Sequence, residues 1–330
     1  MKRIAIVTAA LPSLGLERDL RDLREAIAAD LAYAIERDQL SVRYQPLMHL
    51  PSRSVMGFEA LLRWRHPEFG WIPPDKFIPI AEETGQIIAL GEWVLRQACS
   101  QLRIWQAKFP RRPLLSMNVN LSVRQLADPY LVSKIVGILD ETGVPPEALA
   151  LELTEGSLIS EFDSARKVLG RIRALGVGLK LDDFGTGYSS LSYLGALPFD
   201  TLKIDRCFVH RLLEDRAADA IVEAVVQLAH KLRMKVVAEG VENEAQLRRL
   251  VDLGCDIAQG YLFSEPVTAE IAEHMLADES AAQELHALGS ILKACSNSRR
   301  EPGAEMRPHL LPAANSSPAL LGEFSPITSR

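Results

Sequence analysis

The side chains that could do chemistry in this sequence are carboxylates, amides and one amine, each placed at the end of a run of β-forming residues. Successive members are separated by 61, 32, 30, 21, 36 and 20 residues, and all but the first separation are close to one strand-helix unit. If the chain closes into a barrel, these side chains converge at one mouth. The set is Glu59, Asn120, Glu152, Asp182 with its neighbour Asp183, Lys203, Glu239 and Gln259.

Gathered in one mouth, the five carboxylates of this set would repel one another, because the effective dielectric constant there is lower than in water. A hard divalent cation would relieve the repulsion, and ligands that are all oxygen favour Mg²⁺, Mn²⁺ or Ca²⁺ over zinc. Asp182 and Asp183 could supply ligands to two ions, an arrangement that activates water for in-line attack on a phosphodiester. One acidic residue at a strand end is more often a helix cap, so the repeated spacing carries this prediction.

Lys203 allows a second chemistry. A lysine inside a barrel can form a Schiff base with a carbonyl substrate, as aldolases do. The carboxylates expected around Lys203 oppose this interpretation, because nearby negative charge keeps the amine protonated and therefore non-nucleophilic. An aldolase is kept as an alternative to metal-dependent hydrolysis.

Alternating helices and strands must position these side chains. Apolar residues recur at three- and four-residue steps from Glu17 to Arg37, which predicts an amphipathic helix. Candidate strands follow at Ser41–Met48, Val55–Leu62, Leu114–Leu121, Ala148–Leu153, Gly178–Leu181, Thr201–Ile204, Lys235–Ala238 and Asp256–Gly260. Helices are expected between the later strands at Tyr130–Thr142, Phe162–Leu175, Asp215–Leu232 and Glu244–Leu253.

Repeated strand-helix units imply parallel strands joined by helical crossovers. Eight candidate strands between residues 41 and 260 match the size of a (β/α)₈ barrel. A doubly wound open sheet is the rival fold. Its nucleotide-binding form normally has a glycine-rich turn after the first strand, and this sequence has none there, so the barrel is preferred.

The composition is that of a soluble globular protein, with 330 residues of which 48% are hydrophobic and 24% charged. A formal net charge of −6 argues against binding a nucleic acid polymer, which requires clustered Lys and Arg. The 4 cysteines form no Cys-x-x-Cys pair, so a reducing, cytoplasmic compartment is expected. No uninterrupted run of about 18 apolar residues occurs, and no membrane span is expected.

Two terminal segments are expected to lie outside the barrel. Residues 1–16 are interpreted as a short N-terminal leader, with a secretory signal as the alternative. Residues 281–330 are expected to form a helical end and a disordered tail rich in Pro and Ser, because no apolar periodicity survives from about Ser296 onward. The tail could instead carry a peptide that binds a partner.

Short motifs in the barrel region occur in a fixed order. The run Glu59-Ala60-Leu61-Leu62-Arg63-Trp64 is one of them. The others include Tyr44-Gln45-Pro46, Asn120-Leu121-Ser122, Glu152-Leu153-Thr154-Glu155, Asp182-Asp183-Phe184-Gly185-Thr186-Gly187, Leu202-Lys203-Ile204-Asp205, Ala238-Glu239-Gly240-Val241-Glu242 and Gln259-Gly260-Tyr261. From about Glu17 to Met275, the sequence resembles the EAL-domain family of cyclic di-GMP phosphodiesterases.

The resemblance implies an α/β fold over residues 17–280, a modified TIM (β/α)₈ barrel whose first strand runs antiparallel. It also implies a bacterial enzyme that hydrolyses cyclic di-GMP to linear pGpG with two Mg²⁺ or Mn²⁺ ions. A water between the ions would attack phosphorus. One ion would be held by Glu59, Asn120, Glu152 and Asp182, and the second by Asp182, Asp183 and Glu239.

Further roles follow from the same resemblance. Lys203 would orient the attacking water and offset developing negative charge, and Gln259 would support the water and the ligand network. Arg63 would pair with a phosphate of the substrate, and Gln45 would contact guanine. Every metal-site position holds the expected type of residue. A catalytically silent receptor for cyclic di-GMP is therefore the alternative rather than the first hypothesis.

Regulation is expected at a loop beside the paired aspartates. In the family this loop connects the metal site to the interface of a homodimer, and here it would comprise Glu155, Phe184, Gly185, Thr186 and Gly187. No cyclase or sensory domain is expected before the barrel. Control would then come from the N-terminus, the tail or a separate sensory or regulatory protein.

Overall fold

The computed structural model describes residues 24–111, 113–155, 162–185 and 194–280. The chain divides into two compact units, Met1–Ala282 and Gln283–Arg330, and every described residue lies in the first. The leader expected over residues 1–16 and the tail expected over 281–330 therefore lie outside the described residues. Within the described part, no helix is both long and apolar enough to cross a membrane.

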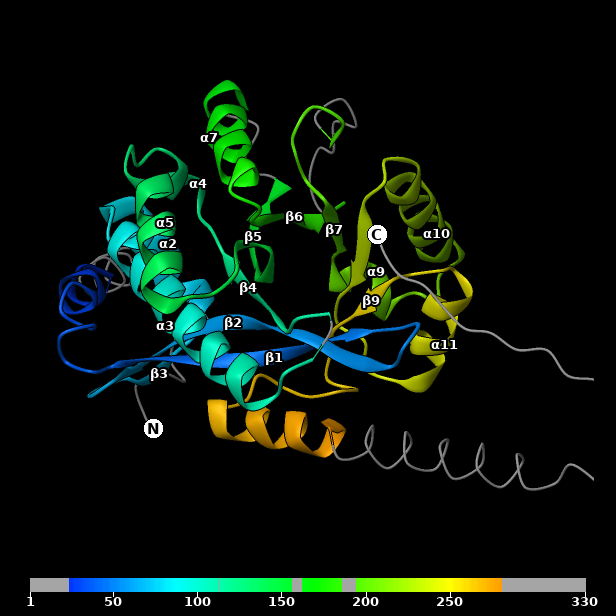
Figure 1. Cartoon of the computed structure of the whole chain (residues 1–330), viewed down its shortest axis with the longest axis horizontal. Coiled ribbons are helices and arrows are strands. Elements are labelled where there is room, and N and C mark those ends of the chain that lie inside the picture. Colours follow the sequence, from blue (N-terminus) through cyan, green and yellow to red (C-terminus); the bar gives the residue numbers. More distant parts are fainter. Residues whose placement is uncertain (1–23, 112, 156–161, 186–193, 281–330) are drawn as a thin grey trace, which may run out of the picture. The chain divides into compact units, whose positions relative to one another are not determined.

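The described strands form a single nine-stranded sheet in the order β1-β9-β8-β7-β6-β5-β4-β2-β3, and β1 also pairs with β2 (Figure 1). That additional pairing closes the sheet into a barrel, to which β3 is appended. The bounds are β1 Leu40–His49, β2 Ser54–His66, β3 Gly70–Ile72, β4 Ser116–Asn120, β5 Leu149–Thr154, β6 Gly178–Phe184, β7 Thr201–Ile204, β8 Lys235–Ala238 and β9 Ile257–Ala258.

Strand directions confirm the predicted modified barrel. The first strand, β1, is antiparallel to both of its neighbours, β2 and β9. The pairs from β2 through β4, β5, β6, β7, β8 and β9 are all parallel. Because helical crossovers join these parallel strands, their carboxyl ends meet at one mouth.

Helices cover the outside of the barrel. Their bounds are α2 Pro74–Thr84, α3 Ile87–Lys108, α4 Val123–Leu126, α5 Leu131–Thr142, α7 Phe162–Ala174, α9 Arg206–His210, α10 Arg216–Lys231 and α11 Glu244–Asp252, with a 3₁₀ turn, η2, at Pro146–Ala148. Outward-facing strand residues pack against these helices in one large core. On α3, Trp105 contacts Tyr44 of β1 and Phe58 of β2, with ring centroids 4.9 and 4.8 Å apart.

The region between β2 and β4 differs from the simple strand-helix repeat. The first separation of 61 residues holds a hairpin, β2–β3, and two helices, α2 and α3. Glu59 consequently lies in the middle of β2 rather than at its end, because β2 continues past the mouth to pair with β3. The prolines at the start of α2 suit the first helical turn, where a backbone N–H is not needed.

The first predicted helix is shorter than its apolar pattern indicates. In the described residues it covers 24–31, and residues 32–38 form turns. Hydrogen bonds that span three residues, from Tyr33 N to Asp30 O and from Ala34 N to Leu31 O, tighten the chain at that point. Asp38 then adopts a left-handed φ of 52°, which reverses the chain into β1.

Candidate active site

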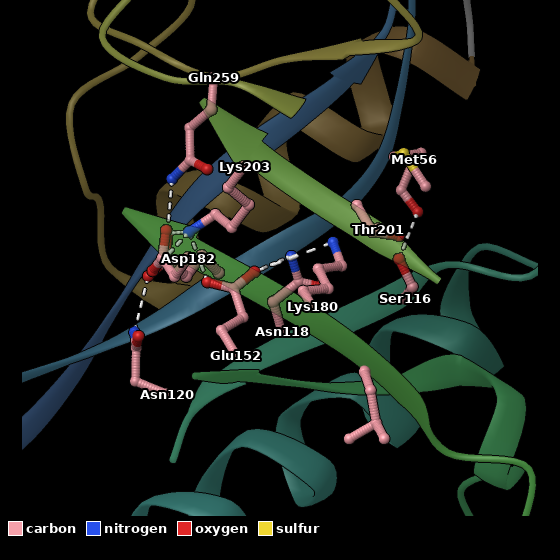
Figure 2. A network of polar contacts seen from close by, with 12 residues as sticks. Met56, Ser116, Asn118, Asn120, Glu152, Lys180, Asp182, Thr201, Lys203 and Gln259 are labelled. Atoms are coloured by element: carbon pink, nitrogen blue, oxygen red, sulfur yellow. Dashed lines mark hydrogen bonds and ion pairs between the residues drawn. The ribbon is translucent and has the colours of Figure 1, made fainter. Parts of the chain in front are cut away.

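Lys203 lies at the centre of a cluster of carboxylates inside the barrel, and its side chain is 1% exposed. Its Nζ donates to Glu152 Oε2 at 2.6 Å and to Asp182 Oδ2 at 3.1 Å (Figure 2). Glu239 Oε1 is a further close partner of this nitrogen, and Glu59 Oε2 lies 3.8 Å from it. Four carboxylates that are distant in the sequence therefore surround one ammonium group.

Amide side chains fix both oxygens of Glu59. Asn120 Nδ2 donates to Glu59 Oε1 at 2.7 Å, and Gln259 Nε2 donates to Glu59 Oε2 at 2.7 Å. The same Gln259 nitrogen donates to Gln45 Oε1 at 2.9 Å, and Gln45 Nε2 donates to the backbone oxygen of Ser264 at 3.1 Å. Glu59 is thereby tied to β4 and to the residue after β9, and through Gln259 to β1.

Asp182, Asp183 and Glu239 form a candidate cation site. One carboxylate oxygen from each lies within 4.8 Å of the other two. Neighbouring residues of a regular strand point to opposite faces, but Asp183 has a left-handed φ of 54° at an irregularity in the β6–β7 pairing. Its backbone N–H donates to Asp182 Oδ1 at 2.9 Å. This strained turn brings both aspartates to the same cluster.

Backbone contacts bring Glu239 and Gln259 to the same rim. Glu239 N donates to Ile204 O at 3.1 Å, which continues the β7–β8 pairing past the end of β8. The loop after Glu239 passes so close to β9 that a Cβ on Gly260 would lie 2.2 Å from Val241 N. Glycine is required at this position, because any side chain would push the two loops apart.

Burial and charge set the protonation of this cluster. Burial raises the pKa of the Glu152 carboxyl from 4.5 to about 7, with Lys203 opposing the shift. Burial also raises the pKa of Glu239 well above its ordinary value. For Lys203, burial alone would lower the pKa, but the surrounding carboxylates raise it well above 10.5. Lys203 is a fixed cation, which argues against the neutral amine that an aldolase would need.

The residues present fit a hard divalent cation. The atoms that can ligate are the oxygens of Glu59, Asn120, Glu152, Asp182, Asp183 and Glu239, the donor type that Mg²⁺ and Mn²⁺ prefer. Lys203 is shared among four carboxylates, so a divalent cation would relieve the repulsion that remains between them. Gln259 Oε1 is buried without a hydrogen-bond partner among the described residues, which calls for a donor such as water.

Comparison with known proteins identifies the family. The family model described as the EAL domain matches residues 28–266. This chain belongs to the EAL-domain family. It is 45% identical over 245 residues to the bifunctional diguanylate cyclase/cyclic di-GMP phosphodiesterase MucR of Pseudomonas aeruginosa, a match that covers 73% of this chain and 35% of MucR.

Other relatives give the same result. The cyclic di-GMP phosphodiesterase NbdA of the same species is 42% identical over 247 residues, covering 75% of this chain and 31% of NbdA. The chain thus spans about a third of the length of the curated relatives it matches. A solved structure described as the PaMucR phosphodiesterase in complex with c-di-GMP has a TM-score of 0.71 and 44% identity, covering 75% of this chain and 99% of that one.

The residues expected to form a regulatory loop in this EAL domain are described only in part. Gly185 N donates to Glu155 Oε2 at 3.4 Å, so these two residues are in contact. Phe184 is buried in the main core. Thr186 and Gly187 lie outside the described residues. The regulatory role of the loop stays a prediction.

The two residues expected to bind substrate lie on adjacent strands. Arg63 follows Glu59 on β2, is partly buried, and donates from Nη1 to the backbone oxygen of Leu62 at 2.9 Å. Burial lowers the pKa of Arg63, and the negative charge of Glu59 opposes that shift. Gln45 is 8% exposed, and its amide already bonds to Ser264 and Gln259. Their contacts with phosphate and guanine stay predictions.

Two buried residues next to the site were not predicted from the sequence. Asn118 Nδ2 donates to Glu152 Oε1 at 2.7 Å, and Lys180 Nζ lies 3.8 Å from the same oxygen. Each precedes a predicted site residue by two positions, Asn120 and Asp182 respectively, and so lies on the same face of its strand. A search for polar residues two positions before each predicted ligand would have found them.

Proposed function

We propose that this EAL domain is a metal-dependent phosphodiesterase that hydrolyses cyclic di-GMP to linear pGpG. The observation that carries the proposal is the convergence of four predicted carboxylates on Lys203 inside the barrel, with Asp183 close to two of them. The names of MucR and NbdA, both described as cyclic di-GMP phosphodiesterases, support it. The bound ligand in the PaMucR structure supports the choice of substrate.

Two cations would be held by overlapping sets of ligands. Glu59, Asn120, Glu152 and Asp182 would hold one Mg²⁺ or Mn²⁺, and Asp182, Asp183 and Glu239 the other. When bound, such ions lower the pKa of a coordinated water and offset the charge of the phosphoryl group. Burial raises the pKa values of Glu152 and Glu239, and neighbouring carboxylates add to both shifts, so bound cations would favour the ionised form of each.

The chain's own residues would contribute orientation and charge. Lys203 stays protonated and would place a fixed positive charge beside the phosphodiester as negative charge develops. Gln259 Oε1, which is buried without a partner among the described residues, would accept a hydrogen bond from the attacking water and orient it. Arg63 would hold a phosphate of the substrate, and Gln45 would contact guanine.

The deciding experiment is a product assay. The purified 330-residue chain is incubated with cyclic di-GMP in Mg²⁺, in Mn²⁺ and in EDTA, and linear pGpG is followed by chromatography. Product should form with either ion and be absent in EDTA and in Asp182→Asn. A matched control is Asp252→Asn, which alters an exposed aspartate on α11 and should leave the rate unchanged. Binding of cyclic di-GMP without turnover would reject the enzyme and identify a silent receptor.

Three further features stay predictions. A homodimer is expected from the loop that contains Gly185, and a cytoplasmic location from the cysteine pattern. A separate sensory or regulatory protein is expected as the source of control. Size-exclusion chromatography with light scattering would test the dimer directly.

A further inference from the structure

Asn118 and Asn120 lie two residues apart on β4 and hold different carboxylates. Asn120 Nδ2 donates to Glu59 Oε1 and Asn118 Nδ2 donates to Glu152 Oε1, each at 2.7 Å. Asn120 is exposed at the mouth, whereas Asn118 is 1% exposed. Asn118 therefore occupies a layer beneath the expected cation ligands, where it cannot meet substrate.

The two oxygens of Glu152 have different partners on opposite sides. Oε2 lies 2.6 Å from Lys203 Nζ, toward the carboxylate cluster, and Oε1 accepts from Asn118. Lys180 Nζ lies 3.8 Å from Oε1, beyond hydrogen-bond distance. Figure 2 shows the carboxylate of Glu152 between Lys203 on one side and Asn118 with Lys180 on the other.

This arrangement fixes the rotation of a buried carboxylate. A carboxylate oxygen without a partner in a buried site is costly, and it turns toward whichever donor is within reach. Without Asn118, Lys180 Nζ at 3.8 Å is a donor toward which Oε1 could turn, and that rotation would change the direction in which Oε2 points. Hydrogen bonds from outer groups orient metal ligands in this way in many proteins.

We propose that Asn118 is a positioning residue that holds Glu152 so that Oε2 faces the carboxylate cluster, and that it thereby strengthens the uptake of divalent cations. The inference rests on the proposed function for the cation site alone, because cation binding can be measured without turnover. Asn118 acts through Glu152, so its effect on cation affinity must disappear when Glu152 can no longer ligate as a carboxylate.

A double-mutant cycle on Mn²⁺ affinity tests this coupling. Titration calorimetry of the full chain compares the wild type, Asn118→Leu, Glu152→Gln and the double variant. Asn118→Leu should weaken Mn²⁺ binding by about 10- to 100-fold, the range for loss of an outer-layer partner. Glu152→Gln should weaken it at least as much. The double variant should bind as Glu152→Gln does, because the two changes remove one shared ligand.

A control variant separates positioning from general damage to β4. Ser116 lies two residues before Asn118 on the same strand, and its Oγ donates to Met56 O rather than to the cluster. Ser116→Ala should therefore leave Mn²⁺ affinity within about twofold of the wild type. Should Asn118→Leu fail to fold by circular dichroism, Asn118→Ser replaces it, since the shorter hydroxyl cannot reach Glu152 Oε1 in the same geometry.

The outcomes are distinct. The positioning role would be overturned if Asn118→Leu bound Mn²⁺ as tightly as the wild type. It would also be overturned if adding Asn118→Leu to Glu152→Gln weakened Mn²⁺ binding as much as Asn118→Leu does alone. Absence of Mn²⁺ uptake by the wild type would overturn it as well. Uptake with the expected coupling but no pGpG would support the positioning of Glu152 while rejecting the phosphodiesterase.

Discussion

The interior of the barrel has two regions with opposite chemistry. Toward the mouth lies the acidic layer, formed by Glu59, Glu152, Asp182, Lys203 and Glu239. Beneath it lies the apolar floor, in which Leu47, Val237 and Ile257 are 0–1% exposed and pack with Met56. Val237 of β8 precedes Glu239 by two residues, so β8 and the residue that follows it contribute to both regions.

This difference separates the sources of stability and of function. The apolar floor removes hydrocarbon from water and fills space, which stabilises the fold. The acidic layer removes charges from water and places like charges together, which opposes folding when no cation is bound.

The apolar floor includes Met56 because of an irregularity in the β1–β2 pairing. The register shifts between Leu47 and Met48, which leaves Met56 without a partner on β1 as a β-bulge.

The largest expected effect is the loss of turnover in the acidic layer. Asp182→Asn removes a carboxylate that is expected to serve both cations, and kcat should fall roughly a thousandfold or more. Stability in EDTA should change little, because the substitution removes both an ion pair with Lys203 and repulsion from the neighbouring carboxylates. Product chromatography gives kcat, and denaturant unfolding gives the free energy. A variant that unfolds without a selective loss of kcat would contradict the contrast between the two regions.

The apolar floor should show the reverse behaviour. Ile257→Ala truncates a side chain that is 1% exposed, and unfolding free energy should fall by about 3 kcal/mol, the usual cost of such a cavity. At a temperature where the variant remains folded, kcat should stay within about threefold of the wild type, since no ligand is touched. A much larger loss of kcat would mean that packing in the floor controls the geometry of the acidic layer.

Glu152→Gln should make the cation-free protein more stable at high pH. Burial raises the pKa of Glu152 from 4.5 to about 7, so the folded protein binds this proton more tightly than the unfolded chain. Glu152 therefore contributes to the unfolding free energy at low pH, and this contribution is lost as pH rises from about 4.5 to about 7. In EDTA at pH 8, the unfolding free energy of Glu152→Gln should exceed that of the wild type by about 2 kcal/mol, and at pH 4 the two should differ little.

Denaturant unfolding at the two pH values measures this difference directly. A gain of the same size at both would show that it comes from packing rather than from charge. Asp252→Asn is the control, because this exposed aspartate lies on α11 outside the acidic layer. Its unfolding free energy should stay within about 0.5 kcal/mol of the wild type at both pH values, as is usual for a surface substitution.

Much of the fold could be predicted from local patterns. The predicted bounds of β7 and β8 match the structure, because short buried apolar runs between helices leave few alternatives. The antiparallel β1 was available only from the family resemblance, since alternation along a strand is the same in both directions. The β2–β3 hairpin was not predicted, because its residues continue the β-forming run past Glu59.

The candidate site was predicted by residue type but not by contact. Spacing placed Glu59, Glu152 and Asp182 at one mouth, and the structure brings all three to Lys203. The left-handed backbone of Asp183 depends on the register between β6 and β7, which spacing along one strand does not contain. Asn118 was missed because only strand ends were considered, whereas it lies two residues before Asn120 on the same face of β4. Polar residues that lie beneath the ligands are therefore the part that sequence reasoning missed.

The smallest expected effect tests how sharply the acidic layer ends. Asn243 follows Glu239 by four residues and caps α11, with Oδ1 accepting from Ala245 N at 3.1 Å and from Gln246 N at 3.0 Å. Asn243→Ala should lower the unfolding free energy by about 1 kcal/mol, the usual cost of a lost N-cap. The Glu242 and Asn243 N–H groups still donate to Gln246 Oε1, so the loop after Glu239 should keep its path and kcat should not change.

Thermal melts and kcat measured on the same preparations would check the expected loss of stability and the unchanged turnover. A selective fall in kcat would extend the functional region from the barrel interior to the cap of α11.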